Sequence, residues 1–257
     1  MQISSSLDDP LERRARPDDL RRATFTVRGA DPADPALHSL LRAWTSEARA
    51  LLEAPAAPLA ASEPAAAGAR LDPETRLRLQ DGLRILDELL RVLCGEEPGE
   101  GRDEGRAVWI ARSADGRAQG VCSTFVCRRA VFVELLAAAP WNLLGPGARG
   151  DPRAVRGTGK ALVAHATRVS RAAGRGGRVA LQAENARCLR AYEHLGFARM
   201  RPSDVPLALV PRGPRGWSPS LLRVARGRSG PEEERCPWLL LDPSPSAPAV
   251  RMAAAAA

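Results

Sequence analysis

The chain has 257 residues, enough for one large domain or for one domain with extensions. Its net charge of +8 comes from basic residues that are scattered and almost all arginine, so the charge does not favour a nucleic acid partner. No apolar stretch approaches the roughly 20 residues that cross a bilayer, and the amino terminus lacks the apolar core of a signal peptide. We therefore expect a soluble, cytoplasmic protein that binds neither nucleic acid nor a membrane.

The first elements are predicted from local residue types. Residues 1–22 are polar and charged, and we expect them to be disordered. A strand is predicted at Ala23–Arg28, where β-branched and aromatic residues gather, and Gly29 should end it. A helix is predicted from Pro35, because apolar residues then recur at helical spacing: Leu37, Leu40, Leu41, Trp44, Ala48, Leu51 and Leu52.

A second helix follows a segment without periodicity. Ala54–Ala69 is rich in Ala and Pro and is predicted to be a flexible link. Asp72 is a candidate N-cap, Pro73 suits the first helical position, and Gly95 should stop the helix. Its expected apolar stripe consists of Leu77, Leu83, Leu86, Leu90 and Leu93.

Three strands are then predicted in close succession. Ala107–Arg112 and Gln119–Arg128 flank an Asp-Gly turn, which is typical of a hairpin. Ala130–Ala138 is apolar apart from Glu134, and such a run favours a central strand covered on both faces.

The remaining elements alternate helix and strand. We predict a helix at Gly157–Ala173, a strand at Arg178–Gln182 and a helix at Ala186–Leu195. One domain should thus span residues 23–200, followed by a Pro/Arg-rich section, 201–257. That section should hold a last strand at Trp238–Leu241 and a disordered tail.

The cysteines and histidines form no recognisable metal site. Cys94, Cys122, Cys127, Cys188 and Cys236 are dispersed, without CxxC or zinc-ligand spacing, and the three histidines are isolated. We expect reduced, packed thiols and no metal.

A glycine-rich turn precedes the predicted helix at 157–173. It reads Arg156-Gly157-Thr158-Gly159-Lys160. Glycine lets a ligand approach the backbone closely, and the N–H groups at a helix start attract an anion. The spacing fits neither a Walker loop nor GxGxxG. The turn is therefore either a phosphate-binding loop or a tight loop before an ordinary helix.

The segment NARCLRAYEHLGF resembles the signature of the GNAT acetyltransferase superfamily. The matching residues are Asn185, Tyr192, Leu195, Gly196 and Phe197. The glycine-rich turn resembles that family's acyl-CoA loop, [QR]-x-x-G-x-[GA], and one helix and one strand separate the two motifs, as in the family. The resemblance covers about Ala107–Phe197. The chain departs from it where the loop's Gln or Arg would be, since Ala154 stands there with Arg153 beside it.

A second departure is the long insert at 141–154, since the family's connection is usually shorter. Trp141 and Asn142, which open it, either line the acceptor side or, in the case of Trp141, anchor the insert on the core.

The resemblance implies a fold and a ligand. The fold would be the GNAT acyl-CoA N-acyltransferase fold, a mixed and mostly antiparallel α/β sheet flanked by helices. Acetyl-CoA would supply the acyl group. Main-chain groups of Leu136, Ala137 and Ala138 would pair with the pantetheine arm. Val155–Lys160 would hold the pyrophosphate, and Asn185 would contact the arm or simply cap its helix.

The resemblance also implies direct attack of an amine on the thioester in a ternary complex. Glu134 is the first candidate for the base, unless it faces outward or pairs with an arginine, and Glu184 is the second. Tyr192, the only tyrosine, would protonate the departing thiolate, or it is a packed aromatic residue.

Several alternatives stay open. The amine could belong to a small molecule or to the N-terminus or a lysine of a protein. A non-catalytic acyl-CoA-binding module of the same fold is a rival interpretation. The sequence does not distinguish a monomer from a homodimer.

Overall fold

The structure is a computed structural model that describes residues 24–54, 71–94, 105–144, 151–201, 204–205 and 236–243. The predicted disordered ends, the predicted link Ala54–Ala69 apart from Ala54, and Gly95 lie outside these residues. The elements in chain order are β1 (Thr26–Ala30), α1 (Pro35–Glu53), α2 (Pro73–Cys94), β2 (Arg106–Arg112), β3 (Ala118–Val126), β4 (Val131–Ala138), α3 (Pro140–Leu143), α4 (Thr158–Ala172), β5 (Val179–Gln182), α5 (Ala186–His194), β6 (Ala198–Arg199) and β7 (Trp238–Leu241).

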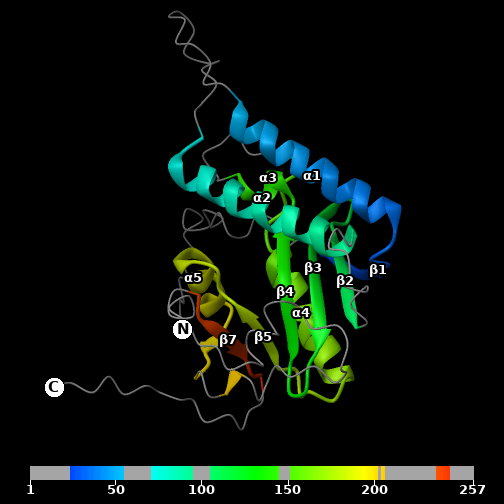
Figure 1. The fold of residues 1–257 in the computed structure, drawn as a ribbon, viewed down its shortest axis with the longest axis vertical. Coiled ribbons are helices and arrows are strands. Elements are labelled where there is room, and N and C mark those ends of the chain that lie inside the picture. The colour runs from blue at the N-terminus through cyan, green and yellow to red at the C-terminus, as the bar shows by residue number, and fades with distance from the viewer. Residues whose placement is uncertain are drawn as a thin grey trace, which may run out of the picture.

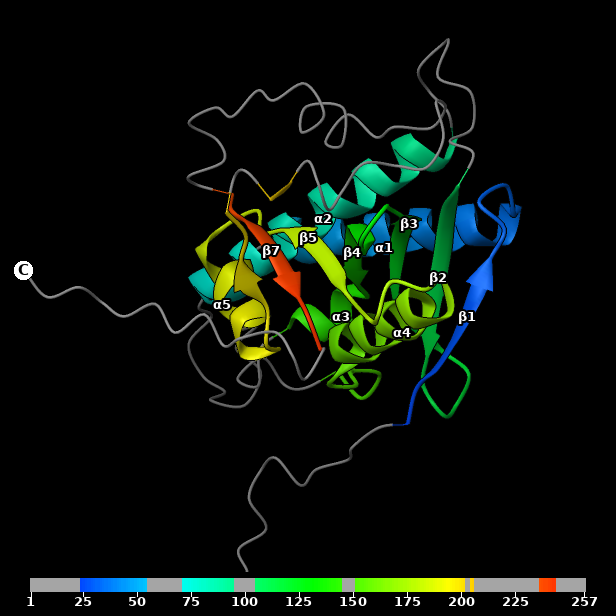
Figure 2. The same ribbon diagram turned by 90° about the horizontal axis from the view of Figure 1, so that it is seen from below.

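One sheet of seven strands, in the order β1-β2-β3-β4-β5-β7-β6, forms the centre of the protein. Every neighbouring pair is antiparallel except β4 and β5, which run parallel. Helices α1 and α2 cover one face, and α4 covers the other (Figures 1 and 2). This mixed, mostly antiparallel sheet between helices confirms the predicted fold class.

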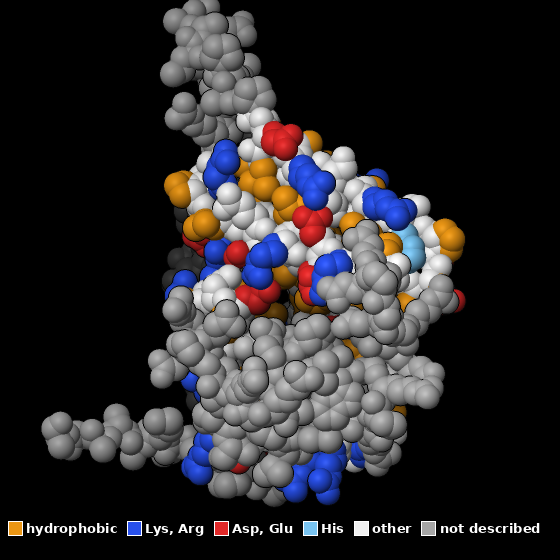
Figure 3. Space-filling model, viewed as in Figure 1, with side chains coloured by type: hydrophobic (Ala, Val, Ile, Leu, Met, Phe, Trp, Pro, Cys, Tyr) orange, Lys and Arg blue, Asp and Glu red, His pale blue; other side chains and the backbone are white. Residues whose placement is uncertain are grey.

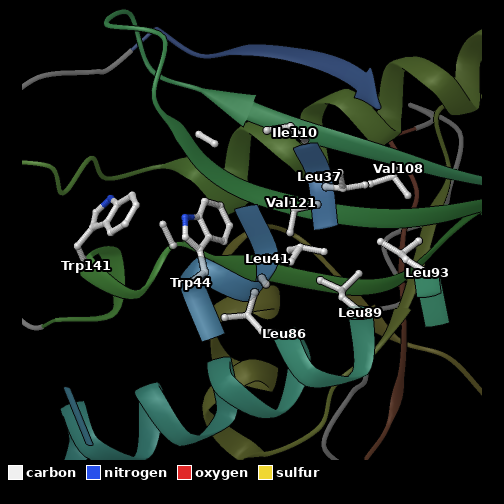
Figure 4. Packing of buried hydrophobic residues seen from close by; sticks show 13 residues of the cluster. Leu37, Leu41, Trp44, Leu86, Leu89, Leu93, Val108, Ile110, Val121 and Trp141 are labelled. Carbon is white, nitrogen blue, oxygen red and sulfur yellow. The ribbon is translucent and has the colours of Figure 1, made fainter. Parts of the chain in front are cut away.

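Helices α1 and α2 pack on the sheet through a leucine-rich cluster. Leu41, Trp44 and Leu86 are buried there with strand residues such as Val121 (Figure 4). The apolar spacing that predicted α1 is confirmed. The stripe predicted for α2 is partly wrong, because Leu77 is 51% exposed while Thr75, Leu79, Gly82 and Leu89 join Leu86 and Leu93 on the buried face.

Strand β1 begins later than predicted and runs through Gly29. Gly29 pairs with Trp109 of β2, and a Cβ on Gly29 would lie 3.5 Å from the Trp109 ring. That distance is an ordinary van der Waals contact, so Gly29 simply continues the strand instead of ending it.

A β-bulge at Glu134 interrupts β4. Ser123 of β3 faces Leu135, whereas the next residue, Thr124, faces Val133, so Glu134 is the extra residue. The bulge switches the faces of the strand: Val133 packs with the α4 cluster, and Leu135 packs with the α1–α2 cluster. An apolar run carries no signal for this switch.

Strand β7 brings the C-terminal section into the sheet. It pairs with β5 from Val179↔Leu241 to Gln182↔Trp238, and on its other edge with β6, which was not predicted. The predicted last strand is confirmed, and it completes the sheet next to β5.

None of the five cysteines forms a disulfide, and burial raises the pKa of the Cys122 and Cys127 thiols to about 12. Within the described ranges, no group of His, Cys, Asp and Glu side chains is placed to hold a metal ion. None of the helices in those ranges has the length and apolar character that crossing a membrane requires.

Candidate active site

The candidate site lies where β4 and β5 separate. The two strands pair only at Val131↔Val179 and Phe132↔Ala180, although β4 continues to Ala138. A small, partly open cavity of about 40 Å³ lies in the gap. Residues from α2, β4, β5 and α5 line it: Ile85, Val133, Glu134, Leu135, Leu136, Leu181, Gln182, Glu184, Cys188 and Tyr192.

The edge of β4 beyond the paired part presents main-chain groups to this gap. Ala139 N donates to Gln119 O at 3.0 Å, which extends the β3–β4 pairing. In an antiparallel pair the residues alternate between facing the partner and facing away. Ala137 therefore bonds to β3, whereas Leu136 and Ala138 direct their N–H and C=O groups to the gap. Two of the three residues predicted to pair with pantetheine have the required orientation, and Ala137 does not.

The glycine-rich turn forms the start of α4. Gly157 is its N-cap with a φ of 98°, and no side chain caps the helix. The first N–H groups of α4 consequently lack a capping acceptor. Arg156 and Lys160 are exposed on either side, and no ion pair involves them within the described residues. The space where a Gly159 Cβ would project is empty. This end of α4 can hold an anion.

Two residues of the predicted loop are turned inward. Val155 N donates to Asn142 Oδ1 at 2.7 Å, so that N–H is already engaged. Thr158 is 4% exposed, and its hydroxyl donates to Val155 O at 3.3 Å. The Thr158 side chain is therefore not available to a ligand, whereas its main chain is.

Trp141 and Arg153, near the two ends of the insert, are fixed to the core. Trp141 is 7% exposed and meets Trp44 edge-on at 5.9 Å, which confirms that it anchors the insert (Figure 4). The Arg153 guanidinium lies 4.3 Å from the Trp141 ring centre and bonds Glu47 and Asp151. Arg153 therefore does not replace the missing Gln or Arg of the loop motif.

Asn185 caps α5, which was one of the two roles predicted for it. Its Oδ1 accepts from the N–H groups of Arg187 and Cys188 at 3.0 and 2.9 Å. Its Nδ2 donates to Asp81 Oδ2 at 2.9 Å, which ties the start of α5 to α2. A contact with the pantetheine arm stays a prediction.

Tyr192 lines the cavity from α5. Its ring lies 5.7 Å from the Phe197 ring at an interplanar angle of 60°. Its hydroxyl has no hydrogen-bond partner among the described residues. Burial raises the pKa of this phenol, and the nearby Cys188 and Glu184 add to the rise. The phenol is thus a neutral donor to which no acceptor in the described part of the chain is bonded.

Glu134 is held by a buried ion pair. Arg106 Nε lies 3.0 Å from Oε2, Arg106 Nη2 lies 3.3 Å from Oε1, and Ser123 Oγ donates to Oε2 at 3.1 Å. The two charged side chains are 6% and 7% exposed. The alternative that Glu134 pairs with an arginine is therefore confirmed. Both of its oxygens are engaged.

Glu184 follows β5 and is more accessible, with 32% of its side chain exposed. Burial raises the pKa of its carboxyl, and the charge and hydrogen bond of Arg84 oppose that rise. Only Oε2 bonds Arg84. No pattern in the sequence indicates Arg84 or Asp81 as contacts of this region, because polar residues between the apolar positions of a helix are expected to face solvent.

Comparison with known proteins identifies solved structures only. No family model matches the chain, and no curated protein matches it. Several of the solved structures that resemble this one are acetyltransferases. An acetyltransferase of the GNAT family from Staphylococcus aureus is 8% identical, with a TM-score of 0.39 over 84% of this chain and 98% of that one.

Two further matches carry more specific names. The PaiA N-acetyltransferase from Thermoplasma acidophilum, in complex with coenzyme A, is 15% identical with a TM-score of 0.39 over 69% of this chain and 91% of that one. Nourseothricin acetyltransferase is 20% identical with a TM-score of 0.33; 54% of this chain matches 66% of it. Identities and TM-scores this low carry no argument about activity, so function is argued from the chain's own site.

Proposed function

We propose that the protein is an N-acetyltransferase that moves the acetyl group of acetyl-CoA to an amine by direct attack within a ternary complex. The observation that carries the proposal is the opening between β4 and β5. It combines an unpaired strand edge with a cavity that holds Tyr192, Glu184 and Glu134.

The coenzyme fits this opening as an extended ligand. The pantetheine arm would pair with Leu136 and Ala138 as an added strand pairs with a sheet edge. The pyrophosphate would lie at the first N–H groups of α4, flanked by Arg156 and Lys160. Asn185 would border the arm where it enters the cavity. This path brings the thioester between the strands, where Tyr192 lies.

Of the two candidate bases, Glu184 suits the reaction better. A primary amine is mostly protonated near neutral pH, so a base must take one of its protons before or during attack. The raised pKa of Glu184 brings it closer to a useful base, and one of its oxygens bonds no side chain in the described ranges. Glu134 would have to leave Arg106 and Ser123 to do the same.

Tyr192 would act on the leaving group. As the amine nitrogen bonds to the acetyl carbon, the carbon–sulfur bond breaks and its electron pair stays on sulfur. The neutral phenol donates its proton or a hydrogen bond to that thiolate. Because burial raises the phenol pKa, hydrogen bonding in the transition state contributes more than complete proton transfer.

The acceptor is an amine of a small molecule or of a protein. Over the α1–α2 face, acidic and basic side chains alternate without a patch of one sign (Figure 3). The charge of this face therefore gives no reason to prefer an acidic or a basic acceptor.

The engaged carboxylate of Glu134 favours one rival, a non-catalytic acyl-CoA-binding module. Release of free CoA thiol across a panel of polyamines, amino sugars, lysine peptides and peptide N-termini, measured beside a calorimetric titration with CoA, separates the two. Acceptor-dependent thiol release supports the enzyme. Binding without turnover on every acceptor supports the module, and absence of binding contradicts both.

A further inference from the structure

A buried glutamine lies behind the glycine-rich turn. Gln119 of β3 is 0% exposed, and both the nitrogen and the oxygen of its side-chain amide are hydrogen-bonded. Its Nε2 donates to Ser113 Oγ at 3.0 Å and to Arg153 O at 3.2 Å. Its Oε1 accepts from Trp141 Nε1 at 3.0 Å and Asn142 Nδ2 at 2.9 Å. Gln119 thereby joins the β2–β3 turn, the insert and the segment before the glycine-rich turn.

Asn142 connects this glutamine to the turn. Its Nδ2 donates to both oxygens of Gln119, Oε1 at 2.9 Å and main-chain O at 3.0 Å. Its Oδ1 accepts from Val155 N at 2.7 Å. One short side chain thus bridges the rigid interior of β3 and the residue that lies two positions before Gly157.

The other end of the turn rests on the neighbouring residue of β3. A Cβ on Gly120 would lie 2.4 Å from Thr158 Cγ2, so the first residue of α4 sits directly against the strand. The Thr158 hydroxyl donates to Val155 O and closes the segment between these two contacts. Two successive residues of β3 therefore fix both ends of the segment 155–158.

We propose that Asn142 is a positioning residue for the coenzyme, an inference that rests on the proposed function. It holds Val155–Thr158 in the shape in which the first N–H groups of α4 point outward, before any ligand binds. A turn ordered in advance does not lose conformational freedom on binding, which favours affinity. Asn142 thus supports the anion-binding turn from behind, through the main chain of Val155.

The test compares two ligands that differ in the pyrophosphate. CoA and pantetheine are titrated into the unchanged protein and into Asn142→Ala. Loss of one oriented hydrogen bond should weaken CoA binding about fivefold to tenfold. Pantetheine, which does not reach α4, should bind within about twofold of its original affinity, a change too small to reflect a lost hydrogen bond.

Trp141→Phe is the matched control. It removes another hydrogen bond to Gln119 but leaves Val155 held, so it should lower the melting temperature without changing the ratio of CoA to pantetheine affinity. The proposal is overturned if Asn142→Ala leaves the ratio of CoA to pantetheine affinity unchanged. It is also overturned if Trp141→Phe lowers that ratio as much as Asn142→Ala does.

Hydrogen exchange gives a readout that needs no variant. The Val155 amide of the ligand-free protein should exchange slowly, and rapid exchange there overturns the proposal even if Asn142→Ala does not fold. If the unchanged protein binds no CoA, the proposed function fails and this inference with it. If it binds CoA but the ratio does not move, only this inference fails.

Discussion

Removal of the Tyr192 hydroxyl is the sharpest perturbation of the site. Tyr192→Phe keeps the ring and its contact with Phe197. The hydroxyl has no hydrogen-bond partner among the described residues, so its removal breaks no hydrogen bond to any of them. The free energy of unfolding should therefore change by less than about 0.5 kcal/mol. A group that donates to a leaving thiolate typically contributes a factor of about 10² to 10⁴ to the rate. Its loss should therefore raise the activation free energy by about 3–5 kcal/mol and lower kcat accordingly.

The assay has three parts. Thiol release from acetyl-CoA gives kcat, a titration with CoA gives the affinity, and thermal unfolding gives the stability. We expect kcat to fall at least about 100-fold, while the other two quantities stay as in the unchanged protein. Burial raises the pKa of the phenol above its ordinary value of 10.0, so the unchanged protein should not lose kcat near pH 10 through Tyr192. An unaltered kcat in Tyr192→Phe refutes a chemical role for the phenol.

Other variants test the base, its partner and the glycines. Glu184→Gln should lower kcat about 100-fold without changing CoA affinity, whereas an unaffected kcat excludes Glu184 as the base. Arg84→Gln removes a charge that lowers the pKa of Glu184, so the pH below which kcat/KM is lost should move upward; a downward move contradicts the assignment. Gly159→Ala should stabilise α4 by about 0.5–1 kcal/mol, as calorimetry would measure, yet weaken CoA binding in a titration. Gly120→Ala should destabilise the protein by about 1–3 kcal/mol in denaturant unfolding, because its Cβ meets Thr158, and normal stability would contradict the close contact.

Much of the fold follows from patterns that are local in sequence. Proline at the first helical position predicts the helix starts at Pro35 and Pro73. The Asp-Gly pair predicts the hairpin turn between β2 and β3, where Gly116 has a φ of 82°. The spacing from Gly157 to Tyr192 identifies a turn, a helix, a strand and a second helix, and each is present in that order.

The bulge at Glu134 could not be predicted, because an apolar run has the same composition with or without an extra residue. Its ion pair joins β4 to Arg106 of β2, 28 residues earlier, and only the strand pairing brings the two together. The sequence names Glu134 as a carboxylate in a central strand but cannot show that its charge is neutralised.

The contacts around the glycine-rich turn also depend on the folded chain. Asn142 lies 13 residues before Val155 and Gln119 lies 23 residues before Asn142, with no periodicity linking them. Arg153 is next to the position where the loop motif has Gln or Arg, yet its side chain packs on Trp141 and bonds Glu47. Proximity in the sequence was therefore a poor guide to its role.

The central claim is that the opening between β4 and β5 brings a thioester to Tyr192. A crystal structure with acetyl-CoA bound tests it most directly, through the distance between Tyr192 Oη and the thioester sulfur. We predict a separation of about 3–3.5 Å, with the pyrophosphate at the start of α4. A sulfur outside the cavity, or a pyrophosphate bound away from Gly157 and Gly159, would contradict the account.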